Sequence, residues 1–382
     1  MVLKDIPQNV WSLGLDRTRP ALDRLGHPER SYRHVLVAGT NGKGSTCVYL
    51  ERILRSMGVS VGTTISPHVT DFTERFRINS RNVGSDILVK VRERIGPEVA
   101  DIGLTYFEWC VVLAATVFAQ EKVDYGIFEI GLGGRYDAAN VLDPAVSLIT
   151  PIALDHTGHL GATIEEIAGE KARIARADRP LITSATGAAL EVIRGYAREI
   201  GAILHVVDTP CEERTSLKGS GQSMNAALAL QAARELGFCP GGVQVAYALN
   251  TAFLPGRIEE IGYRVTLDVA HNPAAMAVFM EYLEHKAFHG IGVFGVLADK
   301  DFQTMMEMMK KTCSRVYIAP VRSDRSWGEA EMAGCLDKER VVRCGSVTEA
   351  FHQALGTGEA VVVTGSFYTV GEVREALVCA GF

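Results

Sequence analysis

The chain has 382 residues, more than one hydrophobic core usually organises, so its length predicts two domains. Hydrophobic residues make up 47% and charged residues 22% of the sequence, and no apolar run approaches the ~20 residues that cross a bilayer, which excludes a membrane-spanning protein. A net charge of −6, without a basic stretch that carries aromatic residues, argues against nucleic-acid binding and leaves small molecules as the expected partners.

The start of the chain, Met1 to Asn9, lacks the apolar segment that directs export, so we expect a cytoplasmic protein. Eight cysteines are scattered and form no CxxC pair, a pattern that favours reduced thiols over a disulfide framework or a zinc site. Most are expected to serve in packing: Cys47, Cys110, Cys211, Cys239, Cys313, Cys335, Cys344 and Cys379.

Apolar, β-rich runs alternate with helix-period segments along the chain, which is typical of parallel sheets covered by helices. Helices are expected at Gly44–Met57 and Phe107–Gln120, among others. The first series of expected strands is His34–Ala38, Val59–Thr64, Tyr125–Ile130, Ser147–Thr150, Pro180–Thr183 and Ile203–Val207. This series predicts a large α/β domain over residues 1–252.

A second, shorter series predicts a smaller Rossmann-like α/β domain over residues 257–382. Its expected strands are Val265–Val269, Gly292–Val296, Arg315–Ala319 and Ala360–Thr364. Its expected helices are Ala274–Lys286, Phe302–Met309 and Val347–Leu355. Pro255 and Gly256 follow a helical segment that ends near Leu249, so the linker is placed at about Thr251–Gly256.

A glycine-rich loop joins the first predicted strand to a helix. The loop consists of Gly39, Thr40, Asn41, Gly42, Lys43, Gly44, Ser45 and Thr46. Glycines let several backbone N–H groups point at one anion, the helix N-terminus adds positive potential, and Lys43 supplies a charge for terminal phosphates. Ser45 or Thr46 can hold a metal-bound oxygen. We therefore predict that this loop binds ATP phosphates, the alternative being a tight turn without a ligand.

The loop departs from the common GxxxxGK[ST] form. Val37 stands where the first glycine of that form would be, and Gly44 separates the lysine from the hydroxyl residue. A general P-loop GTPase is therefore a poorer match.

Ligand-type side chains also follow other strands of the first series, at the edge where α/β sheets bind ligands. Ser66 follows the second strand, Glu129 lies at the end of the third, and His156 follows the fourth. Oxygen ligands suit Mg²⁺, for which histidine is a less usual choice. We predict that Ser66, Glu129 and His156 hold Mg²⁺ beside the ATP phosphates; an isolated histidine could instead be structural.

Lys171 lies on the apolar stripe of a predicted helix, where lysine is unexpected. The capping box of Thr163 and Glu166 opens this helix, and the stripe comprises Ile164, Ile167, Ala168 and Ile174. A desolvated lysine loses its charge readily and can react with carbon dioxide to give a carbamate, which would bind a metal or orient a phosphate. The alternatives are a lysine that extends to solvent or one that pairs with Glu129.

Nine segments, taken in order, carry a resemblance to a known family. They are Trp11–Gly26, Val37–Thr46, Ser66–Asn79, Thr105–Glu108, Phe128–Asn140, Thr150–Arg173, Gly256-Arg257, Leu267–Pro273 and Thr364–Ser366. Through them nearly the whole chain resembles the folylpolyglutamate synthase and dihydrofolate synthase family, a branch of the Mur-type ligases. The resemblance implies a monomeric, ATP- and Mg²⁺-dependent enzyme with a Mur-ligase-like ATP-binding domain and a C-terminal ligase domain.

The resemblance also implies roles for matching residues. Lys171 would be the lysine that such enzymes carry as a carbamate. Nucleotide contacts, beyond those of the loop that contains Lys43, are implied for Asn225, Arg257, Asp268 and His271. Proximity to the pterin-bearing substrate is implied for Phe107, Arg135 and Asp137. The residues themselves support the second-domain site, because the segment Leu267–Pro273 places polar residues just beyond a strand and before a helix.

Two departures from the family pattern bear on binding. Where the family usually has a His-Gln pair before the residue that matches Asn225, this chain has Gly221-Gln222 in a shortened segment, Arg214–Ser223. Ala139 stands where the family often has threonine. We expect the adenine-side contacts and the substrate pocket to differ accordingly.

The expected reaction adds L-glutamate to a folate-type carboxylate, dihydropteroate or tetrahydrofolate, through an acyl phosphate, with ADP and phosphate as products. Lys43, Lys171 and His271 are the expected catalytic residues. Three alternatives remain at this point: a Mur-type ligase for a non-folate acid, a phosphotransferase or nucleotide-driven switch, and a binding protein that kept the fold without catalysis.

Overall fold

The computed structural model describes residues 2–3, 5–7, 14–327 and 340–379. Positions 11–13 of the Trp11–Gly26 segment and Cys335 lie outside this part, as does the side chain of Cys379. The chain divides into two compact units. The first comprises Met1–Ser216 and Gln222–Phe253, and the second comprises Leu217–Gly221 and Leu254–Phe382. Residues 217–221 thus belong to the second unit although the first unit flanks them on both sides.

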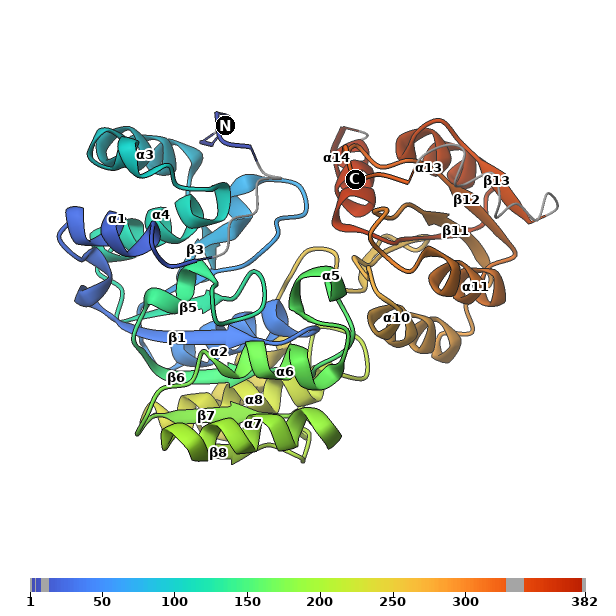
Figure 1. Cartoon of the computed structure of the whole chain (residues 1–382). Helices are drawn as coiled ribbons and strands as arrows, with labels where there is room; N and C mark the ends of the chain where they lie inside the picture. Colours follow the sequence, from blue (N-terminus) through green and yellow to red (C-terminus); the bar gives the residue numbers. More distant parts are fainter. Residues whose placement is uncertain (1, 4, 8–13, 328–339, 380–382) are drawn as a thin grey trace. The chain divides into compact units, whose positions relative to one another are not determined.

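An eight-stranded sheet forms the centre of the first unit, in the order β4-β3-β2-β5-β1-β6-β7-β8 (Figure 1). Six neighbouring strands, β2, β5, β1, β6, β7 and β8, run parallel to one another. At one edge β3 pairs antiparallel with β2, and β4 pairs antiparallel with β3. The bounds are β1 (Arg33–Ala38), β2 (Val61–Thr64), β3 (Phe76–Ile78), β4 (Arg81–Asn82), β5 (Tyr125–Glu129), β6 (Pro144–Ile149), β7 (Pro180–Thr183) and β8 (Ile203–Val206).

Helices cover both faces of this sheet. α2 packs against α8 and α9, while α6 packs against α7, and α4 packs against α1 and α3. The α-helices are α1 (Thr18–Arg24), α2 (Lys43–Ser56), α3 (Ser85–Val99), α4 (Tyr106–Gln120), α5 (Thr157–Leu160), α6 (Ile164–Ala172), α7 (Gly187–Ile200), α8 (Gln222–Glu235) and α9 (Gly242–Asn250). Short 3-10 helices are η1 (Pro28–Ser31), η2 (Phe72–Arg75), η3 (Ala100–Ile102) and η4 (Ala138–Val141).

Strand β1 shows why the sheet sits at the centre. Leu36 and Ala38 pack into the core shared with α4, and the alternating residues Val35 and Val37 are also fully buried. A parallel strand buried on both faces reads as a continuous apolar run, and β1 does so. Its carboxyl end is therefore held rigidly where the glycine-rich loop begins.

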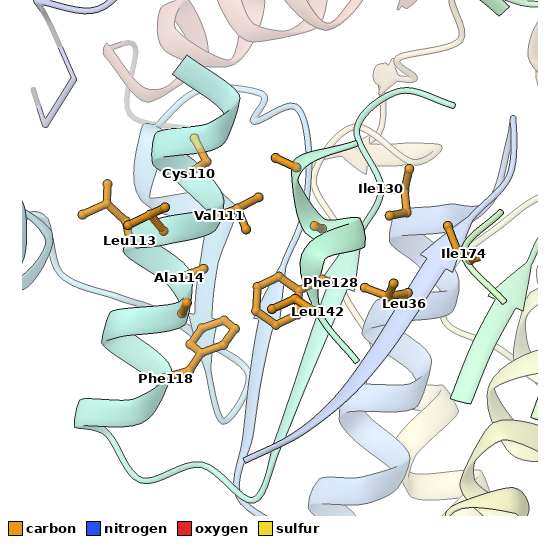
Figure 2. Close-up of a cluster of buried hydrophobic side chains, with 14 of the residues drawn as sticks. Leu36, Cys110, Val111, Leu113, Ala114, Phe118, Phe128, Ile130, Leu142 and Ile174 are labelled. Atoms are coloured by element: carbon orange, nitrogen blue, oxygen red, sulfur yellow. The ribbon is translucent and has the colours of Figure 1, made fainter. Parts of the chain in front are cut away.

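Helix α4 fills the space between the sheet and helices α1 and α3. It is apolar nearly all round and almost entirely buried, as expected for a helix with packing partners on every side. Figure 2 shows Val111 and Phe118 of this helix turned toward Phe128 of β5 and Leu142. A capping box begins α4, in which Thr105 accepts from the Glu108 amide and Glu108 accepts from the Thr105 amide.

The second unit contains a six-stranded sheet in the order β13-β12-β11-β14-β10-β9, with only β9 antiparallel to its neighbour among the described strands. The strands are β9 (Glu259–Ile261), β10 (Val265–Leu267), β11 (Gly290–Phe294), β12 (Arg315–Ile318), β13 (Val341–Arg343) and β14 (Ala360–Thr364). The described helices are α10 (Pro273–His285), α11 (Phe302–Thr312), α13 (Val347–Gly356) and α14 (Phe367–Cys379).

The predicted fold class, two α/β domains with largely parallel sheets, is confirmed. Among the described strands, the sequence analysis missed β3, β4, β9 and β13, which have three residues or fewer and lie at or next to a sheet edge. Of the cysteines with described side chains, four are buried as expected, whereas Cys211 is half-buried and Cys239 is exposed. No helix in the described part of the chain is long and apolar enough to span a bilayer.

Candidate active site

The loop Gly39–Thr46 joins β1 to α2, as predicted. Gly39 and Gly42 have φ values of +142° and +90°, which L side chains rarely adopt, and Gly42 is the N-cap of α2. Thr40 anchors the loop to the segment after β6, because its amide donates to Pro151 O (3.0 Å) and its hydroxyl donates to Ala153 O (3.1 Å). Lys43 Nζ donates to Thr40 O (3.0 Å) within the loop. The arrangement is a tight, glycine-dependent helix start with an ammonium group beside it.

Helix α8 supplies polar side chains to this loop from far along the chain. Gln222 Nε2 donates to Ser45 Oγ (3.3 Å), and Asn225 Nδ2 donates to Gln222 Oε1 (3.3 Å). Asn225 is buried, and a Cβ at Gly42 would overlap its amide oxygen. The structure therefore places Asn225 against the loop, as predicted. It also places Gln222 there, which the sequence analysis mentioned only because Gly221-Gln222 replaces the usual His-Gln pair of the family.

Glu129 and Ser66 lie together at the carboxyl edge of neighbouring strands. Glu129 is the last residue of β5 and is buried, and its Oε2 accepts from the Ser66 amide (2.9 Å) in the turn after β2. Burial and, less strongly, the Glu129 charge raise the pKa of the Cys47 thiol, while the Lys43 charge opposes them. Glu129 and Lys43 thus both lie near Cys47, on the helix that the glycine loop begins.

His156 lies in the loop after β6, on the other side of β1 from β5. It adopts a left-handed backbone conformation (φ 49°) and is the N-cap of α5, with its amide donating to Asp155 Oδ1 (2.8 Å). Among the described residues no three or more His, Cys, Asp and Glu side chains form a metal-binding group. Of the predicted metal ligands, only Glu129 and His156 are of these four residue types, while Ser66 and Lys171 are not. The carboxylate of Glu129 and the hydroxyl of Ser66 suit a hard cation.

Lys171 is buried in α6, with 5% of its surface exposed, so the alternative of a lysine reaching to solvent is wrong. Burial lowers its pKa to about 7, helped by the positive charge of Lys43 and opposed by Asp155 and Asp137. Lys171 thus lies close enough to Lys43 for their charges to interact, and burial favours the neutral form of the Lys171 amine.

The loop after β5 is folded around Asp137. This buried carboxylate accepts from the amides of Gly131 (2.9 Å), Leu132 (3.0 Å) and Ala139 (3.0 Å), and burial raises its pKa to about 6. Gly134 allows the loop to meet α6, because a Cβ there would lie 2.6 Å from the Glu170 carbonyl oxygen. Asp137 therefore holds the loop in its conformation by accepting hydrogen bonds from three backbone amides.

Of the other two predicted substrate residues, Phe107 of α4 packs against this loop and Arg135 lies within it. The Phe107 ring packs on Gly131, where a Cβ would lie 2.6 Å from the ring. Arg135 is half-buried, pairs with Glu170 (3.3 Å) and lies over the Tyr136 ring. Phe107 and Arg135 are thus held at one loop, with an aromatic face and a guanidinium group available beside it.

In the second unit, Arg257 and His271 meet at the Phe367 ring. The Arg257 guanidinium lies 5.1 Å from the ring centroid, and the His271 and Phe367 centroids are 5.6 Å apart. Asp268 is buried and accepts from the amides of Ile258 (2.9 Å) and Ala270 (2.8 Å). Burial raises the Asp268 pKa, against the charges of Arg257 and His271. Three predicted residues therefore gather at one sheet edge, and Phe367, which sequence reasoning missed, joins them.

Comparison with known proteins defines the family. Models of two Mur ligase domains match the chain, the middle domain over residues 37–182 and the glutamate ligase domain over residues 256–367. The chain is 33% identical to the dihydrofolate synthase/folylpolyglutamate synthase of Escherichia coli, over 98% of this chain and 94% of that protein. The chain belongs to this family. The resemblance inferred from the sequence is thereby confirmed.

Solved structures of the family have the same fold. Escherichia coli FolC in complex with DHPP and ADP matches with a TM-score of 0.89 and 32% identity, covering 100% of this chain and 97% of that one. A bifunctional folylpolyglutamate synthase/dihydrofolate synthase with manganese, AMPPNP and L-glutamate bound matches with a TM-score of 0.88 and 33% identity, covering 97% and 95%.

The family also includes longer proteins. The chain spans 48% of the length of a Haloferax volcanii relative named as a probable bifunctional folylpolyglutamate synthase/dihydropteroate synthase, with 32% identity over 94% of this chain. This chain therefore corresponds to about half of that relative.

Proposed function

We propose that this protein is an ATP-dependent ligase that joins L-glutamate to a folate-type carboxylate, either dihydropteroate or tetrahydrofolate. One observation carries the proposal: the glycine loop that begins α2 has Lys43, Glu129 and the buried Lys171 around it, in a chain that belongs to the folylpolyglutamate synthase/dihydrofolate synthase family. Family members bind ADP with DHPP, and AMPPNP with manganese and L-glutamate, which supports the same substrates here.

The chemistry requires an activated acid, because a carboxylate at neutral pH is a poor electrophile. In the first step the substrate carboxylate oxygen attacks the γ-phosphorus of ATP, the bond to the bridging oxygen breaks, and ADP leaves. The glutamate amine then attacks the acyl phosphate and loses a proton. The tetrahedral intermediate collapses to the amide and releases phosphate.

The residues of this chain supply charge and orientation for these steps. Lys43 and the loop amides stabilise the negative charge on the transferred phosphoryl group, and we assign His271 of the second unit the same task. Asn225, Arg257 and Asp268 are assigned to the nucleotide. Phe107 and Arg135 present a ring and a cation for the pterin-bearing acid, and Asp137 shapes the loop that carries Arg135.

Ser66, Glu129 and His156 are assigned to the divalent cation. The buried carboxylate of Glu129 beside Ser66, at the sheet edge, is suited to a hard cation. When bound, Mg²⁺ neutralises phosphate charge. Lys171 is assigned as a carbamate: its neutral Nζ attacks carbon dioxide, a C–N bond forms, and one proton leaves. Burial and a pKa of about 7 support this assignment because they keep much of the amine neutral.

The test measures ADP release with Mg-ATP and glutamate in the presence of dihydropteroate, tetrahydrofolate or neither, with product masses recorded. We expect turnover and a mass gain of one glutamyl unit with at least one of the two acids. Turnover with neither acid would contradict the folate assignment and favour a phosphotransferase. Turnover only with a non-folate acid would favour another Mur-type ligase. A monomeric state remains a prediction from family membership.

A further inference from the structure

A five-residue segment, Leu217–Gly221, belongs to the second unit although the first unit flanks it on both sides; we call it the strap. Both flanks are fixed on the first unit. Ser216 bonds the end of α9, with its amide and hydroxyl donating to Leu249 O at 3.0 and 2.9 Å. On the other flank, Gln222 begins α8 and donates to Ser45 in the phosphate-binding loop.

The middle of the strap is seated on the second unit by three different kinds of contact. Lys218 pairs with Glu260 of β9, and Ser220 Oγ donates to Glu281 Oε2 of α10 (2.6 Å). Between them Gly219 has φ +108°, and a Cβ there would lie 3.1 Å from Val278 and 3.2 Å from Ile258. A side chain at position 219 would therefore be strained in its backbone and crowded in its seat.

The strap is continuous with α8, because Gly221 is followed directly by Gln222, the first residue of that helix. Release of the strap from its seat therefore frees the backbone on which the first turn of α8 begins. The first residue of α8 is Gln222, whose side chain bonds Ser45 and also accepts from Asn225. A shift of Gln222 would thus disturb both its bond to Ser45 of the loop and its bond to Asn225, which packs on Gly42.

We propose that Lys218 is a positioning residue for the phosphate-binding loop, acting through the strap and Gln222. In the described part of the chain Lys218 pairs with Glu260, which is not assigned to the reaction. By holding the strap on Glu260 it fixes the first turn of α8, and that turn holds Ser45 and packs Asn225 on Gly42.

A second lysine provides a matched control. Lys286 also pairs with Glu260 (3.3 Å), but it lies at the end of α10 and does not hold the strap. Lys218→Met and Lys286→Met each remove one partly exposed ion pair to the same carboxylate. Any general effect on Glu260 or on net charge should be common to both variants, whereas an effect through the strap should be confined to Lys218→Met.

The experiment uses the full chain and two readouts: amide hydrogen exchange, and the affinity for ADP. For Lys218→Met we expect faster exchange in the strap, in the first turn of α8 and in residues 39–46. We also expect ADP affinity weaker by about two- to fivefold, the range that a partly exposed ion pair supports. Lys286→Met should match the wild type, and Lys218→Arg should restore it.

Equal behaviour of the two methionine variants would overturn the proposal, as would faster exchange confined to residues 217–221 with unchanged ADP affinity. Gly219→Ala is a second variant that perturbs the seat without changing charge, and it should reproduce the Lys218→Met pattern with a larger effect. The ADP readout rests on the proposed function, but the exchange readout does not. If the wild type failed to bind ADP, the function would be contradicted while the exchange pattern still decided the role of the strap.

Discussion

The two units carry candidate binding residues at the same position in the fold, but they present different chemical groups there. In both, polar residues follow a parallel strand and precede a helix: the loop between β1 and α2 in the first unit, and Asp268–Asn272 between β10 and α10 in the second. The first unit presents backbone amides around glycines, with charges buried nearby. The second presents half-buried side chains that share one aromatic ring. The difference indicates that the first unit depends on rigid backbone geometry, and the second on side-chain stacking.

The largest effect should follow from removing the ammonium group of the first unit. Lys43→Ala is expected to reduce ADP formation at least about a hundredfold, because the charge that opposes the transferred phosphoryl group is lost. The fold should survive, since Lys43 is half-buried and bonds a carbonyl of its own loop. Steady-state ADP release and thermal unfolding check the two parts. Near-normal turnover would remove the loop from the mechanism.

The dependence on backbone geometry can be tested at the two ends of α2. Gly42 and Gly58 have similar φ values, +90° and +83°, but a Cβ at Gly42 would overlap Asn225 whereas nothing lies near Gly58. Alanine at either position strains the backbone by about 1 kcal/mol. We expect Gly42→Ala to lower the free energy of unfolding by roughly 2 kcal/mol more than Gly58→Ala, from overpacking. Equal denaturation midpoints would show that the loop tolerates a side chain.

The buried amine of the first unit should respond to pH where ordinary lysines do not. Only the neutral amine reacts with carbon dioxide, and the pKa of Lys171 is about 7 instead of 10.5. Because carbamate formation also releases a proton, at a fixed concentration of dissolved ¹³CO₂ the carbamate signal should rise steeply with pH below about 7, where most of the amine is still protonated, and less steeply above it. Its absence in Lys171→Met would assign the signal. A signal that rises only near pH 10 would contradict a desolvated, reactive Lys171.

The smallest effect should be in the second unit, at the ring that Arg257 and His271 share. Phe367→Leu removes the aromatic face and should raise the KM for ATP by roughly three- to fivefold, in keeping with a cation–π contact of about 1 kcal/mol. Phe367→Tyr keeps the ring and should stay close to the wild type. If leucine and tyrosine behave alike, the ring is not what orients these residues.

The sequence predicted those parts of the site that local pattern encodes. A glycine loop between a strand and a helix, a carboxylate at the end of an apolar strand and a lysine on an apolar stripe are each visible within about ten residues. Gly39–Thr46, Glu129 and Lys171 were found in this way, and the structure places them as expected. The order of strands around β1 then brings together side chains that the sequence could only align on a common edge.

Contacts between distant segments escaped the sequence analysis because no periodicity encodes them. Gln222 and Ser45 are 177 positions apart, and their bond exists only because α8 packs on α2. Phe367 reads as an ordinary first residue of a helix until Arg257 and His271 are seen beside its ring. The strands β3, β4, β9 and β13 have three residues or fewer, and each contains a charged residue, so no alternation can be read from them.

The strap also determines where the chain could be cut to separate the two units. A single cut at 253/254, the point where the second unit resumes, would leave Leu217–Gly221 attached to the first unit. Glu260 and Glu281 would then lose partners on the second unit, and the surface of Val278 and Ile258 that Gly219 covers would be open to water. The second unit is therefore built from two pieces of chain, and an isolated version would need residues 217–221 joined ahead of residue 254.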